Sequence, residues 1–141
     1  MDLATLETVD GSVPFQLRHP TSNAPLFAQT ADGEDDPSKP IAINIIGKDS
    51  EPFRARLRAI TNKRLAAGKK LKITAEEVET ESTNTIAACI TGWQNVTLDG
   101  KALDYSSANA KVLLSRLPWL QEQLDEAIGD RANFLKKSQT T

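Results

Sequence analysis

The sequence predicts an α+β fold, in which a small antiparallel β unit precedes a mainly helical body of about four helices with one short β-hairpin. Near the N-terminus, apolar residues alternate with polar ones, as in half-buried strands. Further along, apolar residues recur at helical spacing behind capping residues. An Asp-Gly pair between short apolar runs is typical of a hairpin turn. We therefore expect a β-rich subregion at 1–47 and a helical body at 48–141, forming one compact domain with flexible ends.

The N-terminal strands are predicted by their period of two. Val13, Phe15 and Leu17 alternate with polar residues or proline, and isoleucines alternate in the run IAINIIG at 41–47. A further short strand is expected near 25–28. Between them, the acidic run TADGEDDPSKP at 30–40 has too little apolar surface to order itself, so it is predicted to be a solvated hairpin tip or loop.

The first two helices are predicted by their ends. A cap at residue 49 or 50 begins a helix that stops at Gly68. A threonine and a glutamate with capping-box spacing begin the second helix at Thr74. We expect that helix to reach Gly92, with Trp93 on its apolar side.

The segment from 91 to 107 is predicted to be a corner between helices. Asp99 and Gly100 tolerate the positive φ angles of a two-residue hairpin turn. A serine at 106 or 107 then caps a helix of about 108–117, and Pro118 begins the last helix. The apolar stripe of that last helix is broad and continues to residue 135.

The sequence contains no recognisable catalytic or metal-binding constellation. His19 is the only histidine, so no second imidazole is available for a metal pair, and no acid stands where it would orient a base. Cys89 is the only cysteine and lies in an apolar helical stripe, where a thiol is inert. Phosphate-binding glycine loops, nucleophile elbows and zinc spacings are missing. We therefore expect a protein that is not an enzyme and uses no cofactor or metal.

The charge distribution argues against nucleic acid as a partner. Residues 48–72 carry nine basic side chains and two acids. On a helical projection Arg54 and Arg58 lie on one flank of the apolar stripe, while Arg56 and Lys63 lie on the other. A groove-reading helix instead gathers its basic residues on one face. A solvated rim or an acidic protein partner fits this pattern better.

No apolar run is long enough to span a membrane, and the acidic N-terminus lacks the features of a signal peptide. We therefore expect a soluble protein of the cytoplasm that does not bind membranes.

Two departures from clean patterning predict a partner surface. Val112 lies opposite the apolar stripe of its helix, and Arg131 lies near the centre of the last stripe, where an unpaired charge is costly. For Arg131, the alternatives are a pair with Glu122 or Asp125, or simple exposure at the helix end. The predicted partner-binding residues are Val112, Trp119, Leu120, Leu124, Ile128, Arg131, Phe134 and Leu135.

Residues of about 41–135 resemble the tail assembly chaperones of long-tailed bacteriophages and related prophage proteins. The resemblance is carried by Gly92-Trp93, by the Asp99-Gly100-Lys101 turn and by Tyr105-Ser106 ahead of Ala108-Asn109-Ala110. It continues in the leucine-rich helix interrupted by Pro118 and in the terminal Ala132-Asn133-Phe134. These are structural residues without a catalytic signature. The β-rich first third is the departure, because it is less typical of the compact helical members of that family.

The resemblance implies a non-enzymatic protein of the host cytoplasm that is absent from the mature virion. It would bind the tape-measure protein, with the major tail protein as a further partner, until the tube polymerises. It also implies a longer frameshifted product, for which Lys136-Lys137 is the suggested slip site. A structural tail or connector protein and a small nucleic-acid-binding regulator are the alternatives, and the resemblance leaves a homo-oligomer open.

Overall fold

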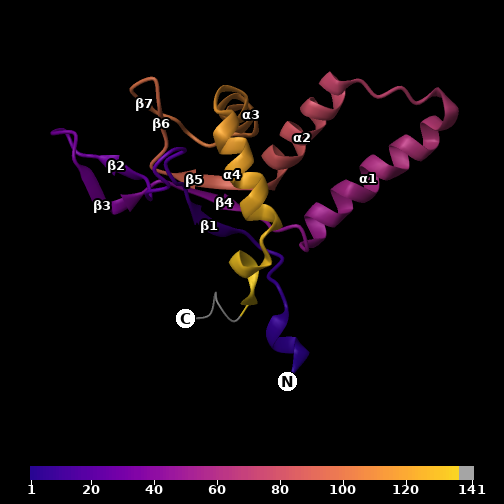
Figure 1. Cartoon of the computed structure of the whole chain (residues 1–141), viewed down its shortest axis with the longest axis horizontal. Coiled ribbons are helices and arrows are strands. Elements are labelled where there is room, and N and C mark those ends of the chain that lie inside the picture. The colour runs from indigo at the N-terminus through magenta and orange to yellow at the C-terminus, as the bar shows by residue number, and fades with distance from the viewer. Residues whose placement is uncertain (137–141) are drawn as a thin grey trace.

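The computed structural model describes residues 1–136 and confirms the α+β class (Figure 1). The strands are β1 (Val13–Gln16), β2 (Phe27–Gln29), β3 (Asp35–Pro40), β4 (Ala42–Ile45), β5 (Ile90–Gln94), β6 (Thr97–Leu98) and β7 (Lys101–Ala102). The helices are α1 (Glu51–Ala67), α2 (Ala75–Cys89), α3 (Ser107–Arg116) and α4 (Pro118–Gly129), with 3-10 turns at Leu3–Leu6, Gly68–Lys70 and Arg131–Phe134. The four predicted helices are all present.

A three-stranded antiparallel sheet with the order β1-β4-β5 organises the fold. Its central strand is β4, where Ile43 pairs with Phe15 on one side and with Trp93 on the other. Both Ile43 and Ile45 are fully buried, as the alternating isoleucines predict. Because β5 follows α2 in the chain, this sheet joins segments from both sides of residue 47.

The acidic segment is a hairpin, and half of its prediction is wrong. The tip closes at Thr30, whose N–H donates to the carbonyl of Glu34 at 2.7 Å. Residues 35–40, expected to be irregular, instead form β3 against β2. Backbone pairing orders this strand although most of its side chains are exposed. Prolines are tolerated there because an edge strand does not need every N–H in a ladder.

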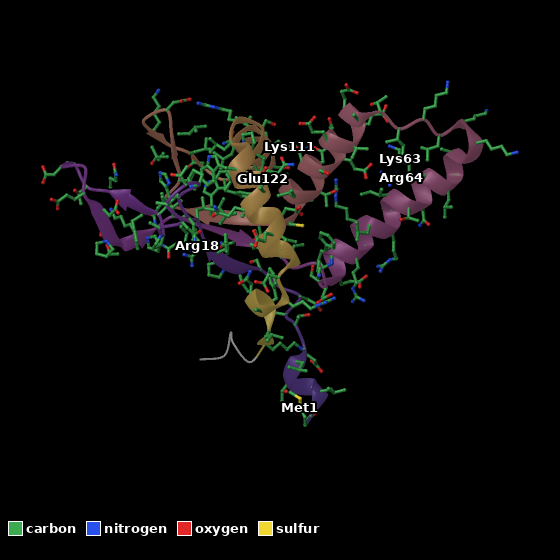
Figure 2. The ribbon with its side chains drawn as sticks, in the orientation of Figure 1. Met1, Arg18, Lys63, Arg64, Lys111 and Glu122 are labelled. Carbon is green, nitrogen blue, oxygen red and sulfur yellow. The ribbon has the colours of Figure 1, made fainter. Side chains whose placement is uncertain are left out.

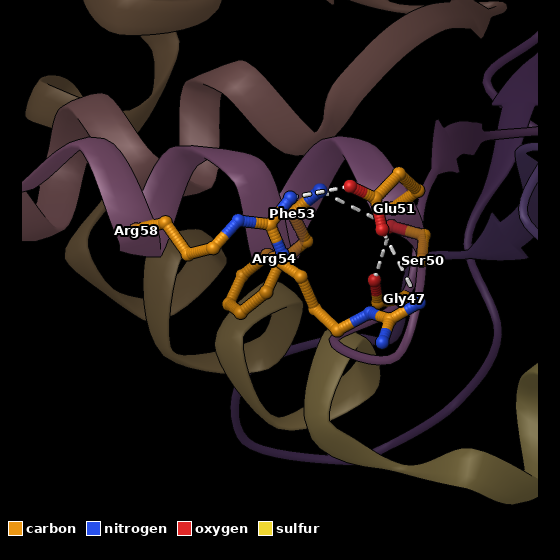
Figure 3. Close-up of polar contacts among 6 residues, drawn as sticks. All are labelled: Gly47, Ser50, Glu51, Phe53, Arg54 and Arg58. Carbon is orange, nitrogen blue, oxygen red and sulfur yellow. Dashed lines mark hydrogen bonds and ion pairs between the residues drawn. The ribbon is translucent and has the colours of Figure 1, made fainter.

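The helix starts are as predicted. Ser50 caps α1 by accepting from the N–H of Phe53 at 3.4 Å, while its hydroxyl donates to the carbonyl of Gly47 at 2.6 Å (Figure 3). Thr74 caps α2 by accepting from the N–H of Glu77 at 3.1 Å. Gly68 ends α1 with a φ of 53°, a conformation that favours glycine.

The predicted end of α2 is wrong. The helix stops at Cys89, and residues 90–94 turn into β5, which pairs with β4 from Ala42–Gln94 to Ile45–Ile90. Gly92 and Trp93 are therefore strand residues. The β-branched Ile90 and Thr91 suit a strand, but the pairing partner lies more than forty residues earlier and leaves no local signal.

The segment after β5 is a structural corner, as predicted. Asp99 and Gly100 have φ angles of 54° and 79°, and they join β6 to β7. Trp93 donates through Nε1 to the carbonyl of Leu103 at 2.7 Å, and the ring of Tyr105 stands edge-on to it with centroids 5.2 Å apart. Arg116 forms a forked ion pair with Asp99 at 2.6 and 3.0 Å. These contacts fix the hairpin and the residues after it to β5 and to the end of α3.

The core lies between the sheet and helices α2, α3 and α4. Its members form one cluster that includes Ile43, Ile45, Ile86, Leu113, Leu114, Leu120, Leu124, Ile128 and Phe134. The edge of the sheet is tied to α4 by Gln123, which accepts from the N–H of Arg18 at 2.7 Å and donates to its carbonyl at 3.0 Å (Arg18 is labelled in Figure 2). Helix α1 contributes no buried residue to this core.

A candidate binding groove on the helical arm

Helix α1 and the outer part of α2 project from the body as a V, joined at the tip by residues 68–74 (Figure 1). We call residues 51–84 the arm. None of the seventeen residues of α1, all of them described, is buried. An amphipathic helix of this length normally buries its apolar stripe against a neighbour. Phe53 at the base packs against the core, but beyond it the body leaves the stripe of α1 largely uncovered.

Large apolar side chains are exposed along the arm. They are Leu57, Leu65, Leu71, Ile73 and Val78, of which Leu65 is 74% exposed. Outside the arm, the exposed large hydrophobic residues of the described chain are Tyr105, Val112 and three residues of the N-terminal turn. Scattered single exposures need no explanation, but a concentration on one projecting element is typical of an interaction surface.

A groove of about 560 Å³, which we call the arm groove, lies between the two helices. Its first wall is formed by α1 through Arg56, Ile60, Lys63, Arg64 and Ala67, and Leu71 and Ile73 form its end at the tip. Its second wall is formed by α2 through Glu76, Glu77, Thr80, Glu81 and Asn84. The groove thus combines a basic wall, an acidic wall and three large apolar lining residues, Ile60, Leu71 and Ile73, which we call the apolar strip.

Two polar contacts hold the walls at their present separation. Arg64 bonds to Glu81 at 2.8 Å, and Arg56 donates through Nε to the hydroxyl of Thr85 at 3.3 Å. Figure 2 shows Arg64 and its neighbour Lys63 on the side of α1 that is turned toward α2. Arg64 is in the last turn of α1 and Thr85 is in the body half of α2, so the two contacts join the walls near both ends of the stretch that α1 lines.

The remaining charges of the arm groove are uncompensated. Among residues 1–136, no ion pair involves Lys63, Glu76 or Glu77. The outer face of α1 is different, because Arg54 and Arg58 both pair with Glu51 (Figure 3). The hydrogen bond from Arg58 is the main reason that the pKa of Glu51 lies below its ordinary value. The outer arginines thus have an ion-pair partner within the chain, whereas Lys63, Glu76 and Glu77 in the groove have none among the described residues.

A second groove of about 370 Å³ lies at the base of the arm, where α1 faces α2 and α4. It shares Ile60, Arg64 and Glu81 with the arm groove and is lined additionally by Leu57 and Cys89. Cys89 is buried, and this burial raises the pKa of its thiol to about 12. The thiol is therefore neutral and packs as a small apolar group, which gives this groove no nucleophile.

The arm is anchored to the body at a tight junction. An added Cβ on Gly47 would lie 2.9 Å from two ring carbons of Phe134, so the ring rests directly on the backbone where β4 turns into α1. Next to it, Arg131 forms a forked ion pair with Asp49 at 2.6 and 3.1 Å. The hydrogen bond from Arg131 lowers the pKa of the Asp49 carboxyl. The C-terminal turn thus fixes the root of the arm.

Half of the predicted partner-binding residues lie in the core of this fold and not on an exposed face. Leu120, Leu124, Ile128 and Phe134 are each at most 4% exposed. They are covered because α4 packs against α2 and α3 and because Phe134 seats on Gly47. In this fold, a partner does not reach these four side chains.

The other four predicted residues are spread over different surroundings. Val112 is 48% exposed on α3 and Trp119 is half-buried against the core. Leu135 is half-buried and bridges to Thr8 near the N-terminus. Arg131 has its partner within the chain, and that partner is Asp49 and not the suggested Glu122 or Asp125. The structure therefore does not gather these residues into one surface.

The sequence reasoning missed the arm as a binding surface, although one signal pointed to it. The stripe of α1 is thin, with Phe53, Leu57 and Ile60 followed by Arg64 where a core helix would place another apolar residue. A stripe of this kind has little to bury. The neighbouring basic residues were interpreted as a solvating rim or as contacts for an acidic protein partner.

Comparison with known proteins places the chain in a phage-derived group. Residues 48–141 match the model of a family described as YdaY prophage protein. The chain belongs to the YdaY prophage protein family. Neither the curated proteins nor the solved structures provide a significant match. The matched region begins just before α1, so the arm, the corner and the last two helices all lie inside the part shared with the YdaY family.

Other classes of site find no support among residues 1–136. No described helix is long and apolar enough to cross a membrane. No group of three or more His, Cys, Asp or Glu side chains within that range could hold a metal ion. His19 is exposed, and its Nδ1 accepts from the N–H of Thr21 at 3.2 Å, which makes it part of a turn. Lys137 of the suggested slip site lies outside the described residues.

Proposed function

We propose that this prophage protein is a tail assembly chaperone that binds the tape-measure protein in the host cytoplasm and holds it until the tail tube polymerises. The observation that carries the proposal is the arm, a projecting helical hairpin whose apolar side chains the body does not cover. Membership in a prophage family supports the phage setting. The resemblance of residues 41–135 to tail assembly chaperones supports the specific task.

The physical demand on such a chaperone matches the arm. A tape-measure chain is long and helical, and its apolar stripes would aggregate in water before the tube encloses them. A holder must cover a helical segment with apolar surface and surround it with charge for solubility. The arm groove has an apolar strip of Ile60, Leu71 and Ile73 together with charged walls. The chemistry required is binding alone.

The test is co-expression of the protein with the tape-measure protein of the same prophage. We expect a soluble complex with the wild type and an insoluble tape-measure protein with L71D/I73D, which places two charges on the apolar strip. Val112→Asp is the matched control, because Val112 is as exposed as these residues but lies on α3, outside the arm groove. If L71D/I73D keeps the complex and V112D loses it, the client binds α3 and the arm is not the site.

Two further measurements separate the chaperone from a structural tail component and examine the second partner. Mass spectrometry of purified virions should lack the protein, whereas a tail or connector subunit would be present in stoichiometric amount. Co-expression with the major tail protein tests whether tube subunits are also held. Sedimentation of each complex gives the oligomeric state of the chaperone.

A further inference from the structure

The arm groove is electrically asymmetric, with basic residues on its α1 wall and acidic residues on its α2 wall, and this asymmetry limits what can fill it. On α1, Lys63 and Arg56 stand on one side of the apolar strip, and on α2, Glu76 and Glu77 stand on the other. All four line the groove, and Lys63, Glu76 and Glu77 have no ion-pair partner among the described residues. A ligand that covers the strip must come within reach of both walls.

The dimensions fit a helix. Five residues of α1 line one wall over a span of twelve positions, from Arg56 to Ala67, which corresponds to roughly 17 Å of helix length at 1.5 Å per residue. This is the length of about three helical turns. An amphipathic helix presents an apolar ridge with a flank on each side of it. In the groove, that ridge would lie on Ile60, Leu71 and Ile73 and its flanks would face the walls.

Resting on the proposed chaperone function, we infer that the client segment is an amphipathic helix with acidic residues on one flank of its apolar ridge and basic residues on the other. The acidic flank pairs with Lys63 and Arg56, and the basic flank pairs with Glu76 and Glu77. A helix with the same charge on both flanks would be attracted to one wall and repelled by the other. The arm groove thus selects helices of mixed charge.

The same asymmetry fixes the direction of the bound helix. Reversing a helix along the groove while its ridge stays on the strip exchanges its two flanks. One direction therefore places unlike charges together, and the opposite direction places like charges together. Each client segment is held with its N-terminus pointing either to the tip of the arm or to the body, according to which flank is acidic.

The experiment uses the full chain and three synthetic helices of about 21 residues, or three heptads. All share one leucine ridge and differ in their flanks: Glu on one and Lys on the other, Glu on both, or Lys on both. A hydrocarbon staple on the face opposite the ridge holds their helicity equal, which circular dichroism verifies, because free Glu–Lys pairs would otherwise favour the mixed helix. Fluorescence anisotropy at physiological salt gives each affinity.

We expect the mixed helix to bind about tenfold more tightly than either uniform helix. In each uniform helix, two or more partly exposed contacts between one flank and its wall change from attraction to repulsion. In E76K/E77K both walls are basic, so the helix with Glu on both flanks should become the tightest ligand. The milder variant E76Q/E77Q removes the charge without placing lysines in the first turn of α2, and it should abolish the preference for a basic flank. The matched control D32K/E34K makes the same charge change on the exposed β2–β3 tip and should keep the wild-type ranking.

Several outcomes would overturn the inference. Equal affinity for all three helices would show that charge does not select the client. A wild-type dimer that E76K/E77K or E76Q/E77Q dissociates would assign the arm groove to a second copy of the chain. A DNA duplex that displaces the mixed helix at physiological salt would assign it to nucleic acid. If the tape-measure protein is held while the three helices bind equally, the chaperone function stands and only the charge selection fails. If the mixed helix is preferred but the tape-measure protein is not held, the charge selection stands and the chaperone function fails.

Discussion

Replacing Gly47 by alanine should loosen the root of the arm. The new Cβ would lie 2.9 Å from two carbons of the Phe134 ring and 3.1 Å from a third, whereas carbon atoms pack favourably at about 3.5 to 4.0 Å. The ring would have to withdraw by roughly half an ångström or more. It has little freedom to do so, because Phe134 is 2% exposed and its carbonyl accepts from the N–H of Val9 at 2.7 Å.

The size of the effect follows from two bounds. Overpacking of a well-filled site costs about 1 to 3 kcal/mol, and complete loss of a buried phenylalanine ring costs about 3 to 5 kcal/mol. A ring that shifts but stays buried belongs to the first range, so we expect a loss of about 2 kcal/mol for Gly47→Ala. Urea denaturation measures it, with Gly11→Ala as the control, because nothing lies within 4 Å of a Cβ at Gly11.

A double-mutant cycle with Phe134→Ala isolates the clash. In the F134A background the ring is gone, so adding G47A should cost less than about 0.5 kcal/mol and the coupling energy should be about 1.5 to 2 kcal/mol. If G47A is as stable as G11A, or if G47A lowers the free energy of unfolding equally with and without the ring, the Phe134 ring does not pack against Gly47 as described.

The remaining predictions separate core from surface and examine the titrating groups. Leu124→Ala should destabilise the fold by about 2 to 5 kcal/mol in urea because Leu124 is fully buried. Leu57→Ala, at a side chain 45% exposed on the arm, should change stability by no more than about 0.5 kcal/mol; a larger loss would show that the stripe of α1 is covered in solution. Because the pKa of Asp49 is lowered in the folded state, its pairing with Arg131 stabilises the fold above the ordinary carboxyl pKa of 3.8 and this stabilisation is lost as pH falls through the lowered value. Wild type and Arg131→Met should therefore differ in stability at pH 7 and converge once the pH falls below the lowered pKa of Asp49; a gap that persists in acid would contradict this. Cys89, with its pKa raised to about 12, should resist iodoacetamide at pH 8 in the native protein and react once urea unfolds it; rapid native labelling would show that the base of the arm opens.

The parts of the fold that depend on neighbouring residues could be predicted from the sequence. Ser50, Thr74 and Ser106 each cap a helix by accepting from an N–H three residues ahead, so the helix starts are written locally. The turn at Asp99 and Gly100 is local in the same sense. Strand β5 is different, since residues 90–94 become extended by pairing with β4. Because the end of α2 is set by pairing with a distant strand, the residues of the helix carry no local signal for it.

The candidate site could not be predicted for a related reason. The stripes of α1 and of α4 have the same spacing, and periodicity reports that a face is apolar without saying what lies against it. The sequence favours the broader stripe, which contains Leu120 and Leu124, as the partner-binding surface. In the structure this stripe is buried in the core. The thinner stripe, with Arg64 inside it, is the one left uncovered.

The arm leaves and re-enters the sheet at one place, because Ile45 at the end of β4 is paired with Ile90 at the start of β5. Residues 46–89 are therefore an insertion between two paired strands, and its two ends lie next to each other. An insertion of this kind can be shortened, lengthened or exchanged at its tip at little cost in chain-closure entropy. The part of α2 that precedes the buried Ile86, Ala87 and Cys89 contributes no buried residue to the core. A new tip can therefore be grafted onto an unaltered base, much as antibodies vary their loops on a fixed framework.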